Sequence, residues 1–135
     1  MILVDTGPLV ALCDERDKLH RRALRELDDL PLSGRGVCLP VLAEALFLLS
    51  AVHLRKRLEL LFEENIFEPY PLREPEHRLS QCFQWLEEYE EHAPDFADAY
   101  LIVASSAEAN SRIWTFDREF STVWRLPNGR PVRLA

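Results

Sequence analysis

Four acidic residues of this chain lie in apolar surroundings. Asp5 follows MILV at the start of the chain, and Glu44 lies inside the apolar run PVLAEALF. Asp98 precedes AYLIVA, and Asp117 follows RIWTF. Burying an ionised carboxylate without a partner costs several kcal/mol, so such a group needs a cation, a proton or hydrogen-bond donors. Because four acids share this feature, we expect a cation to be held between them.

A site made only of carboxylates favours a hard divalent ion. Carboxylates ~5 Å apart repel each other by about 3 kcal/mol per pair at an effective dielectric of ~20, so a cluster of four needs a cation. Oxygen ligands select Mg²⁺ or Mn²⁺, and these ions suit phosphate chemistry. Zinc is not indicated, because the histidines are scattered and no cysteines have ligand spacing. The residues concerned are His20, His53, His77, His92, Cys13, Cys38 and Cys82.

Each of these acids also has a structural alternative. An aspartate can cap a helix or form a turn, which fits Asp5 with Pro8 three residues on. Asp95 and Asp98 have the spacing of a capping-box pair, which favours the helix dipole and would explain Asp95 fully. Glu44 could form a buried ion pair or take up a proton. We therefore rank Asp98 as a site residue and Asp95 as a cap or secondary ligand.

The elements expected around these acids alternate between strands and helices. Short apolar stretches predict strands at 1–5, 37–39, 66–70, 112–117 and 132–134. Helical spacing of apolar residues predicts a helix at 8–12, capped by Thr6 or Gly7, and further helices at 18–30, 40–52, 54–64, 75–92 and from 95 onward. Such alternation is typical of an α/β fold with a parallel sheet covered on both faces. Sites in such sheets form at the carboxyl ends of strands, where Asp5 and Asp117 are expected.

Packing expectations follow from the same patterns. The segment 40–52 is apolar nearly all round and predicts a buried helix. The strand at 1–5 is the most apolar in the chain and is expected to be central. Pro69 suggests that the strand at 66–70 lies near an edge. Gly34 and Gly36 predict a turn. The helix at 75–92 is expected to turn an apolar set of side chains inward, and Trp114 and Phe116 are expected in the core rather than as base-stacking platforms; the inward set on 75–92 is Leu79, Cys82, Phe83, Trp85 and Leu86.

Bulk properties predict one small domain spanning 1–135. The chain has 135 residues, 47% of them hydrophobic, which suffices for one core. Three widely spaced cysteines suggest buried thiols in a reducing cytoplasm, and no window is apolar enough to span a membrane. The net charge of -7 argues against a protein that coats polyanions, but not against a nucleic-acid enzyme. Local basic stretches at 18–22 and 55–57 could still meet phosphate, although solvated helix faces are the favoured explanation for each one taken alone.

Four motifs together resemble the PIN-domain family, and within it the VapC-type toxins of toxin–antitoxin pairs. They are VDTGPLVAL, PVLAEALF, FADAYLIVASSAE and TFDREF, which span positions 4 to 120. The resemblance implies a three-layer α/β/α sandwich whose metal-binding acids are Asp5, Glu44, Asp98 and Asp117. It also implies supporting hydroxyls at Thr6 and Thr115. The chain departs from the family pattern at Glu119, where an aspartate is common, and at Gly7-Pro8.

The resemblance implies an Mg²⁺- or Mn²⁺-dependent endoribonuclease acting as the toxin of a type II toxin–antitoxin pair. Its products would carry 5′-phosphate and 3′-hydroxyl ends, and Arg112 and Arg118 would position the RNA backbone. The implied partners are an antitoxin that covers the acids and a second copy of the chain. Tyr70, Trp124 and the segment 54–62 are the expected dimer surface. An aspartate-based phosphatase and a non-catalytic acidic binding module remain as alternatives.

Overall fold

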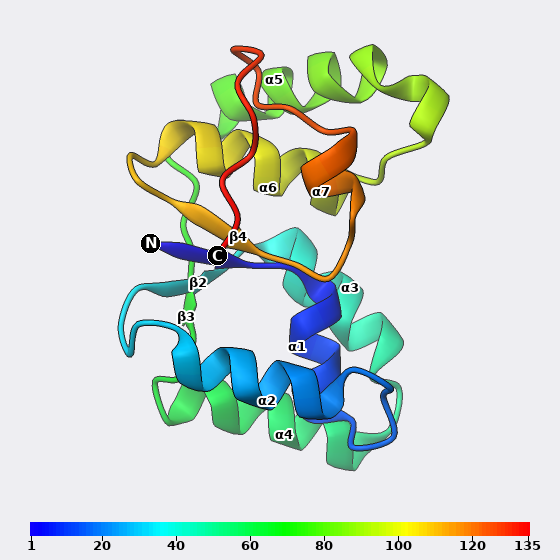
Figure 1. Ribbon diagram of the computed structural model, residues 1–135, viewed down its shortest axis with the longest axis vertical. Helices are drawn as coiled ribbons and strands as arrows, with labels where there is room; N and C mark the ends of the chain where they lie inside the picture. The colour runs from blue at the N-terminus through cyan, green and yellow to red at the C-terminus, as the bar shows by residue number, and fades with distance from the viewer.

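The computed structural model describes residues 1–135 as three layers with a parallel sheet in the middle (Figure 1). All neighbouring strands are parallel, and their order is β3-β2-β1-β4. The strands are short: β1 Ile2–Val4, β2 Arg35–Val37, β3 Glu68–Pro69 and β4 Arg112–Trp114. This confirms the expected α/β sandwich with a parallel sheet.

Helices cover both faces of the sheet. The bounds are α1 Thr6–Cys13, α2 His20–Asp29, α3 Leu39–Leu48, α4 Val52–Glu63, α5 Pro75–Glu88, α6 Phe96–Ala107 and α7 Glu119–Thr122, with a 3₁₀ turn at Glu90–His92. Figure 1 shows α5, α6 and α7 on one side of the sheet and α2 and α4 on the other. Helices α1 and α3 stand at the end of the sheet where β1 leaves it, and α3 contacts both α1 and α6.

The most apolar strand is central, as expected from MILV. All three residues of β1 are buried, and β1 pairs with β2 on one side and β4 on the other. β3 is one of the two edge strands, which fits the proline that ends it. The carboxyl ends of β1 and β4 therefore lie side by side, because Val4 is in register with Trp114. Their following residues, Asp5 and Thr115, enter the same edge of the sheet.

The expected strands at 37–39 and 132–134 differ most from the observed ones. The second strand begins at Arg35 instead of Val37, so Gly36 is a strand residue and only Gly34, with a φ of 72°, is in the turn. An added Cβ at Gly36 would lie 3.0 Å from Tyr70 Cβ, so the close approach of β3 explains the glycine. The expected strand at 132–134 is reduced to a single parallel bridge between Ile113 and Leu134.

The long helix α5 is rotated relative to the expectation. Cys82 and Trp85 are buried, as predicted, whereas Leu79 and Phe83 are exposed. The inward stripe runs through the buried Cys82 and Trp85 to the half-buried Tyr89, at helical spacing. Trp85 stacks on Trp124 with ring centroids 4.9 Å apart. The C-terminal segment thus selects the face of α5 that turns inward, and local periodicity did not contain that information.

Several other expectations can be compared directly with the packing. All three cysteines are free and buried. Trp114 is buried and Phe116 is half-buried, so both belong to the packed interior more than to an exposed platform. Tyr70 and Trp124 are also buried, so they are not available as a dimer surface. None of the helices has the length and apolar character that a membrane crossing needs.

Candidate active site

An acidic pocket of about 350 Å³ lies at the carboxyl ends of β1 and β4. It brings together residues from α1, α3, the start of α6 and the segment after β4. This pocket contains all four acids singled out in the sequence, together with Asp95 and Asp17. Its lining residues are Asp5, Thr6, Gly7, Val10, Asp17, Glu44, Leu48, Asp95, Asp98 and Asp117. Acids far apart in the chain therefore converge, as the apolar context of each one predicted.

Asp5 is both a helix cap and a pocket residue. It precedes α1, where its Oδ1 accepts a hydrogen bond of 2.8 Å from the backbone N–H of Thr6. Its Oδ2 accepts a second bond, of 2.6 Å, from Thr115 Oγ1. Burial raises the pKa of Asp5 to about 6, although these two hydrogen bonds oppose the rise. The structural and functional interpretations of Asp5 are thus compatible, because each carboxylate oxygen accepts one hydrogen bond and keeps a second lone pair.

Glu44 enters the pocket from α3 and is less buried than the sequence suggested. Its side chain is only half-buried, because α3 packs on one side and leaves Phe47 82% exposed. The Thr6 hydroxyl donates a 2.6 Å hydrogen bond to Glu44 Oε2. No basic side chain pairs with Glu44. Thr6 therefore ties the start of α1 to the acid on α3, which supports its predicted role as a supporting hydroxyl.

Asp95 and Asp98 form the capping box that their spacing indicated. The backbone N–H of Asp98 donates to Asp95 Oδ1 at 2.8 Å, and that of Asp95 donates to Asp98 Oδ2 at 3.1 Å. Asp98 is half-buried, and burial raises its pKa to about 8, with Asp95 and Asp5 adding to the rise. Asp95 is exposed at the pocket rim. Ionisation of Asp98 is therefore less favourable than that of Asp95, because the Asp98 carboxylate is less accessible to water.

Thr115 organises the opposite wall of the pocket. Its hydroxyl donates to Asp5 and accepts a 2.9 Å hydrogen bond from the backbone N–H of Asp117. Asp117 is exposed, and its Oδ1 accepts from the backbone N–H of Glu119. The Glu119 side chain does not line the pocket. Thr115 thus links the acid after β1 to the acid after β4.

The donor set of the pocket fits a hard divalent ion. Every charged group in its lining is a carboxylate, and neither histidine nor cysteine contributes. No three of these carboxylates come close enough to enclose an ion as they stand. The carboxylates nevertheless face one shared space, and two of them are already oriented by threonine hydroxyls. The residues that would hold the ion are Asp5, Glu44, Asp98 and Asp117.

The two arginines expected at the rim are separated by the fold. Arg118 is exposed and directly follows Asp117, so it lies beside the pocket. Arg112 is the first residue of β4 and pairs with Ile2, at the amino ends of the strands. At ~3.3 Å per residue, Arg112 is about 10 Å from Thr115 along the strand. The placement of Arg112 at the acidic pocket was therefore wrong, because the expectation did not take strand direction into account.

Two residues near the pocket were not identified from the sequence. Asp17 lines the pocket from the loop before α2, and nothing in its local pattern distinguishes it from a surface acid. Arg22 on α2 lies 4.6 Å from the centroid of the Phe116 ring and forms a 2.6 Å ion pair with Glu26. The basic stretch at 18–22 hinted at Arg22, but its contact with Phe116 spans 94 positions of the chain and is purely tertiary.

Comparisons with known proteins agree with this fold. The chain resembles VapC20 of Mycobacterium tuberculosis, a toxin that cleaves the sarcin-ricin loop, with 22% identity and a TM-score of 0.76 over 90% of this chain and 94% of that one. It also resembles FitAcB from Neisseria gonorrhoeae, with 20% identity and a TM-score of 0.59 over 87% of this chain and 88% of that one. No curated protein sequence matches the chain. The family model of the PIN domain matches residues 2–126, so the chain belongs to the PIN-domain family.

Proposed function

We propose that this PIN-domain protein is a divalent-metal-dependent endoribonuclease and the toxin of a toxin–antitoxin pair. One observation carries the proposal: carboxylates from separate segments of the chain line one pocket at the carboxyl ends of the central strands. A protein of similar fold, VapC20, is a toxin that cleaves the sarcin-ricin loop, which supports RNA as the substrate class. The clustered acids also explain how a chain of net charge -7 could act on a polyanion.

Asp5, Glu44, Asp98 and Asp117 would hold Mg²⁺ or Mn²⁺ in this pocket. Such an ion supplies Lewis-acid chemistry, which activates water and stabilises charge on a leaving oxygen. The protein's own contribution is orientation. Thr115 holds Asp5, and Thr6 holds Glu44, so two carboxylates are oriented before substrate arrives.

Asp98 makes this site responsive to a cation. Its raised pKa shows that the protonated carboxyl is favoured where it lies, chiefly because of burial. A nearby cation favours the ionised form instead, so binding of the ion would release the proton. Asp95 keeps its backbone and side-chain bonds to Asp98 and fixes the start of α6 while this happens.

Arg118 and Arg22 are the basic residues placed to contact the RNA backbone. Arg118 lies next to Asp117, and Arg22 is held beside the same segment by Phe116 and Glu26. Guanidinium groups bind phosphate oxygens without reading base sequence. In this proposal they position the scissile strand over the acidic pocket.

The direct test is the variant D5N with D29N as the matched control. Asn keeps the size and the capping oxygen of Asp5 but removes a charged ligand, so RNA cleavage should fall by more than about 100-fold. Asp29 is exposed on α2, outside the acidic pocket, so D29N should cleave as the wild type does. Cleavage would be measured with Mn²⁺ and with EDTA, and the ends of the products would be mapped.

Cleavage that persists in D5N or in EDTA contradicts the proposed nuclease. Products with ends other than 5′-phosphate and 3′-hydroxyl contradict the proposed chemistry. If the chain shows neither Asp5-dependent binding of Mn²⁺ nor RNA cleavage, the protein is an acidic binding module instead.

An antitoxin partner fits the apolar surface beside the acids. Phe47 and Val52 are 82% and 75% exposed, and Leu48, between them in the sequence, lines the acidic pocket itself. A protein segment that covers these side chains would also obstruct the acids. Phe47→Ser should weaken binding of the protein encoded by an adjacent reading frame while RNA cleavage is unchanged. Equal binding of that protein by the wild type and the variant would contradict this placement.

A homodimer is part of the same proposal. Because Tyr70 and Trp124 are buried, a dimer would have to use other apolar side chains, such as Leu60 at 48% exposure on α4. Sedimentation of the purified chain across a range of concentrations tests this. A mass that stays at one chain throughout would contradict the dimer.

A further inference from the structure

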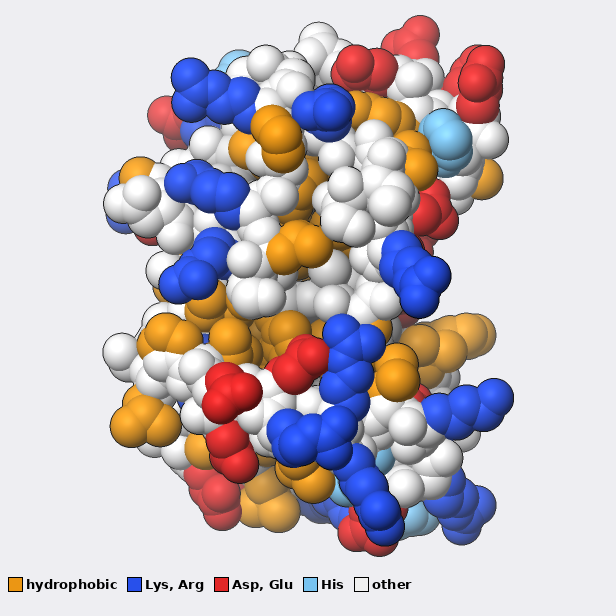
Figure 2. Space-filling model, viewed as in Figure 1, with side chains coloured by type: hydrophobic (Ala, Val, Ile, Leu, Met, Phe, Trp, Pro, Cys, Tyr) orange, Lys and Arg blue, Asp and Glu red, His pale blue; other side chains and the backbone are white.

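The C-terminal segment has a charge opposite to that of the whole chain. From Phe120 to Ala135 it contains three arginines and no acidic side chain, whereas the chain has a net charge of -7. Figure 2 shows Lys and Arg side chains gathered on the upper left of the molecule, over this segment, while acidic side chains lie mainly at the upper right and in the lower half. The segment therefore forms a local basic surface.

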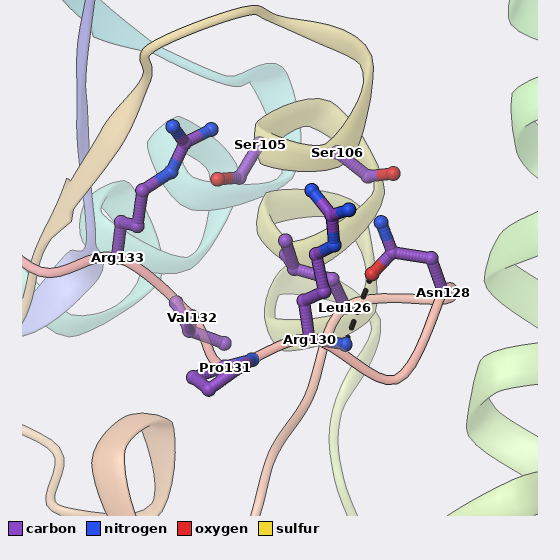
Figure 3. A pocket seen from close by; sticks show the side chains of 8 residues that line it. All are labelled: Ser105, Ser106, Leu126, Asn128, Arg130, Pro131, Val132 and Arg133. Carbon is purple, nitrogen blue, oxygen red and sulfur yellow. Dashed lines mark hydrogen bonds between the residues drawn. The ribbon is translucent and has the colours of Figure 1, made fainter.

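This surface contains a pocket of about 450 Å³, separate from the acidic one. Its walls are the C-terminal segment and the last turn of α6. The lining residues are Ser105, Ser106, Leu126, Asn128, Arg130, Pro131, Val132 and Arg133. Figure 3 shows that the side chains of Arg130 and Arg133 both extend toward the serines of α6. We call this site the arginine pocket.

The polar groups of the arginine pocket are mostly free hydrogen-bond donors. Neither Arg130 nor Arg133 forms an ion pair, and no acid lines the pocket. Asn128 Oδ1 accepts a 3.0 Å bond from the backbone N–H of Arg130, which leaves its side-chain N–H₂ to face the pocket (Figure 3). The exposed Ser106 hydroxyl can donate as well. Two guanidinium groups, one amide and one hydroxyl therefore surround the same space.

An anion is the ligand that this donor set fits. The C-terminus of α6 disfavours binding of an anion in this pocket, because a helix C-terminus carries about half a negative charge. Two guanidinium groups outweigh this, since each carries a full positive charge in a geometry that matches phosphate oxygens. The repulsion between an anion and the carbonyl groups at the end of α6 is further reduced by Ser111, whose Oγ donates a 2.9 Å hydrogen bond to the Ser105 carbonyl.

The position of the arginine pocket relates it to the acidic pocket. Both pockets use α6: Asp98 is in its first turn and Ser106 in its last. Eight residues of helix separate them, a rise of about 12 Å. Successive phosphates of a nucleic-acid strand advance by about 3.4 Å along a helix axis, so a strand that reaches both pockets needs at least three or four nucleotides.

We propose that the arginine pocket binds a phosphate group, and that this phosphate belongs to the RNA strand whose scissile bond lies over the acidic pocket. The second part rests on the proposed nuclease function, whereas the first does not. The pocket acts on binding and on the minimum length of the substrate. It takes no part in bond cleavage, because it lies at the other end of α6 from the acids.

Inorganic phosphate tests the pocket without RNA or metal. In an NMR titration at constant ionic strength, the backbone amides of 128–133 and Ser106 should shift and saturate in the wild-type protein. The variant R130Q/R133Q should lose these shifts. The control R25Q/R73Q removes the same charge from exposed arginines outside both pockets and should keep them. Absence of saturable shifts in the wild type, or equal loss in both variants, overturns the phosphate site.

RNA binding tests the second part of the proposal. In a D5N background without divalent ions, R130Q/R133Q should bind an RNA long enough to reach both pockets about tenfold more weakly. Loss of one phosphate contact should also reduce the slope of log affinity against log salt by about 0.7. A short RNA that covers only the acidic pocket should bind equally well to both proteins.

These outcomes separate the pocket from the proposed function. If D5N still cleaves RNA, the nuclease assignment fails, and the phosphate titration decides the pocket by itself. If phosphate binds but R130Q/R133Q binds long RNA as tightly as the D5N parent, a small phosphate compound is the ligand and the RNA assignment is overturned. If RNA is cleaved through Asp5 and phosphate does not bind, the pocket proposal alone is wrong.

Discussion

Helices α3 and α6 are similarly apolar in composition but have different surroundings. Each is largely apolar and carries one site acid, in LPVLAEALFL and FADAYLIVASSA. Yet α6 buries seven residues, whereas α3 buries only Val41 and Ala45. The difference arises because α6 lies between the sheet and α5, while α3 stands at the end of the sheet and packs on one side (Figure 1). An apolar helix can therefore serve a core or a partner surface, and composition does not distinguish them.

The two helices also hold their acids in different ways. Asp98 on α6 is constrained by a capping box and has a pKa raised by burial. Glu44 on α3 is half-buried and is held by the hydroxyl of Thr6 on another helix. The pocket thus combines an acid fixed by its own helix with one fixed across helices. This contrast can be tested by variants of each helix.

The largest expected effect is on folding. Leu101 on α6 is fully buried, so Leu101→Ala should lower the free energy of unfolding by about 2–5 kcal/mol. Phe47→Ala on α3 removes a larger side chain that is 82% exposed, so its effect should stay within about 0.5 kcal/mol. Urea denaturation of both variants measures the difference. Similar losses would show that α3 is packed as tightly as α6.

The next effect is on activity, and here the two helices should become equivalent. E44Q and D98N each remove a charged oxygen from the proposed ion site, so each should lower RNA cleavage by more than about 100-fold. Circular dichroism should show that both variants remain folded. Glu63→Gln, on the exposed end of α4, is the control. Full activity of either E44Q or D98N would show that the acid in question is not a ligand of the proposed ion.

A smaller effect is expected from the hydroxyl that holds Glu44. Thr6→Val keeps the shape of the side chain but removes its 2.6 Å hydrogen bond to Glu44, so Mn²⁺ affinity should fall by about 10-fold. Thr6→Ser keeps a hydroxyl and should restore most of the affinity. Calorimetric titration of Mn²⁺ measures both. If Ser and Val behave alike, packing rather than the hydrogen bond explains the role of Thr6.

The smallest effect concerns pH and separates Asp98 from Glu44. Because the pKa of Asp98 is raised from 3.8 to about 8, the folded state holds its proton more tightly than the unfolded state. The resulting stability is present below pH 4 and is lost as pH rises toward 8. Without metal, the melting temperature of the wild type should therefore decline over this range more steeply than that of D98N.

E44Q retains Asp98 and should follow the steeper wild-type decline. Saturating Mn²⁺ should reverse the trend in the wild type, because the ion binds the ionised carboxylate. Parallel curves for the wild type and D98N without metal would contradict a raised Asp98 pKa.

The sequence alone predicted the elements and the principal acids. Alternating apolar strands and amphipathic helices are local patterns, so the parallel sheet, its central first strand and its edge strand with Pro69 were all anticipated. Asp5, Glu44, Asp98 and Asp117 were identified because an acid in an apolar run is costly wherever the chain folds. The capping box of Asp95 and Asp98 is likewise a local signal, and the structure confirms it.

Tertiary structure alone decided which faces are covered and which polar groups meet. The rotation of α5, the exposure of Phe47 and the misplacement of Arg112 depend on neighbours and strand direction, which local periodicity does not encode. The contact of Arg22 with Phe116 and the arginine pocket join segments far apart in the chain. Local sequence thus determined which residues are costly to bury. The packing of distant segments determined which of them are buried and which groups they contact.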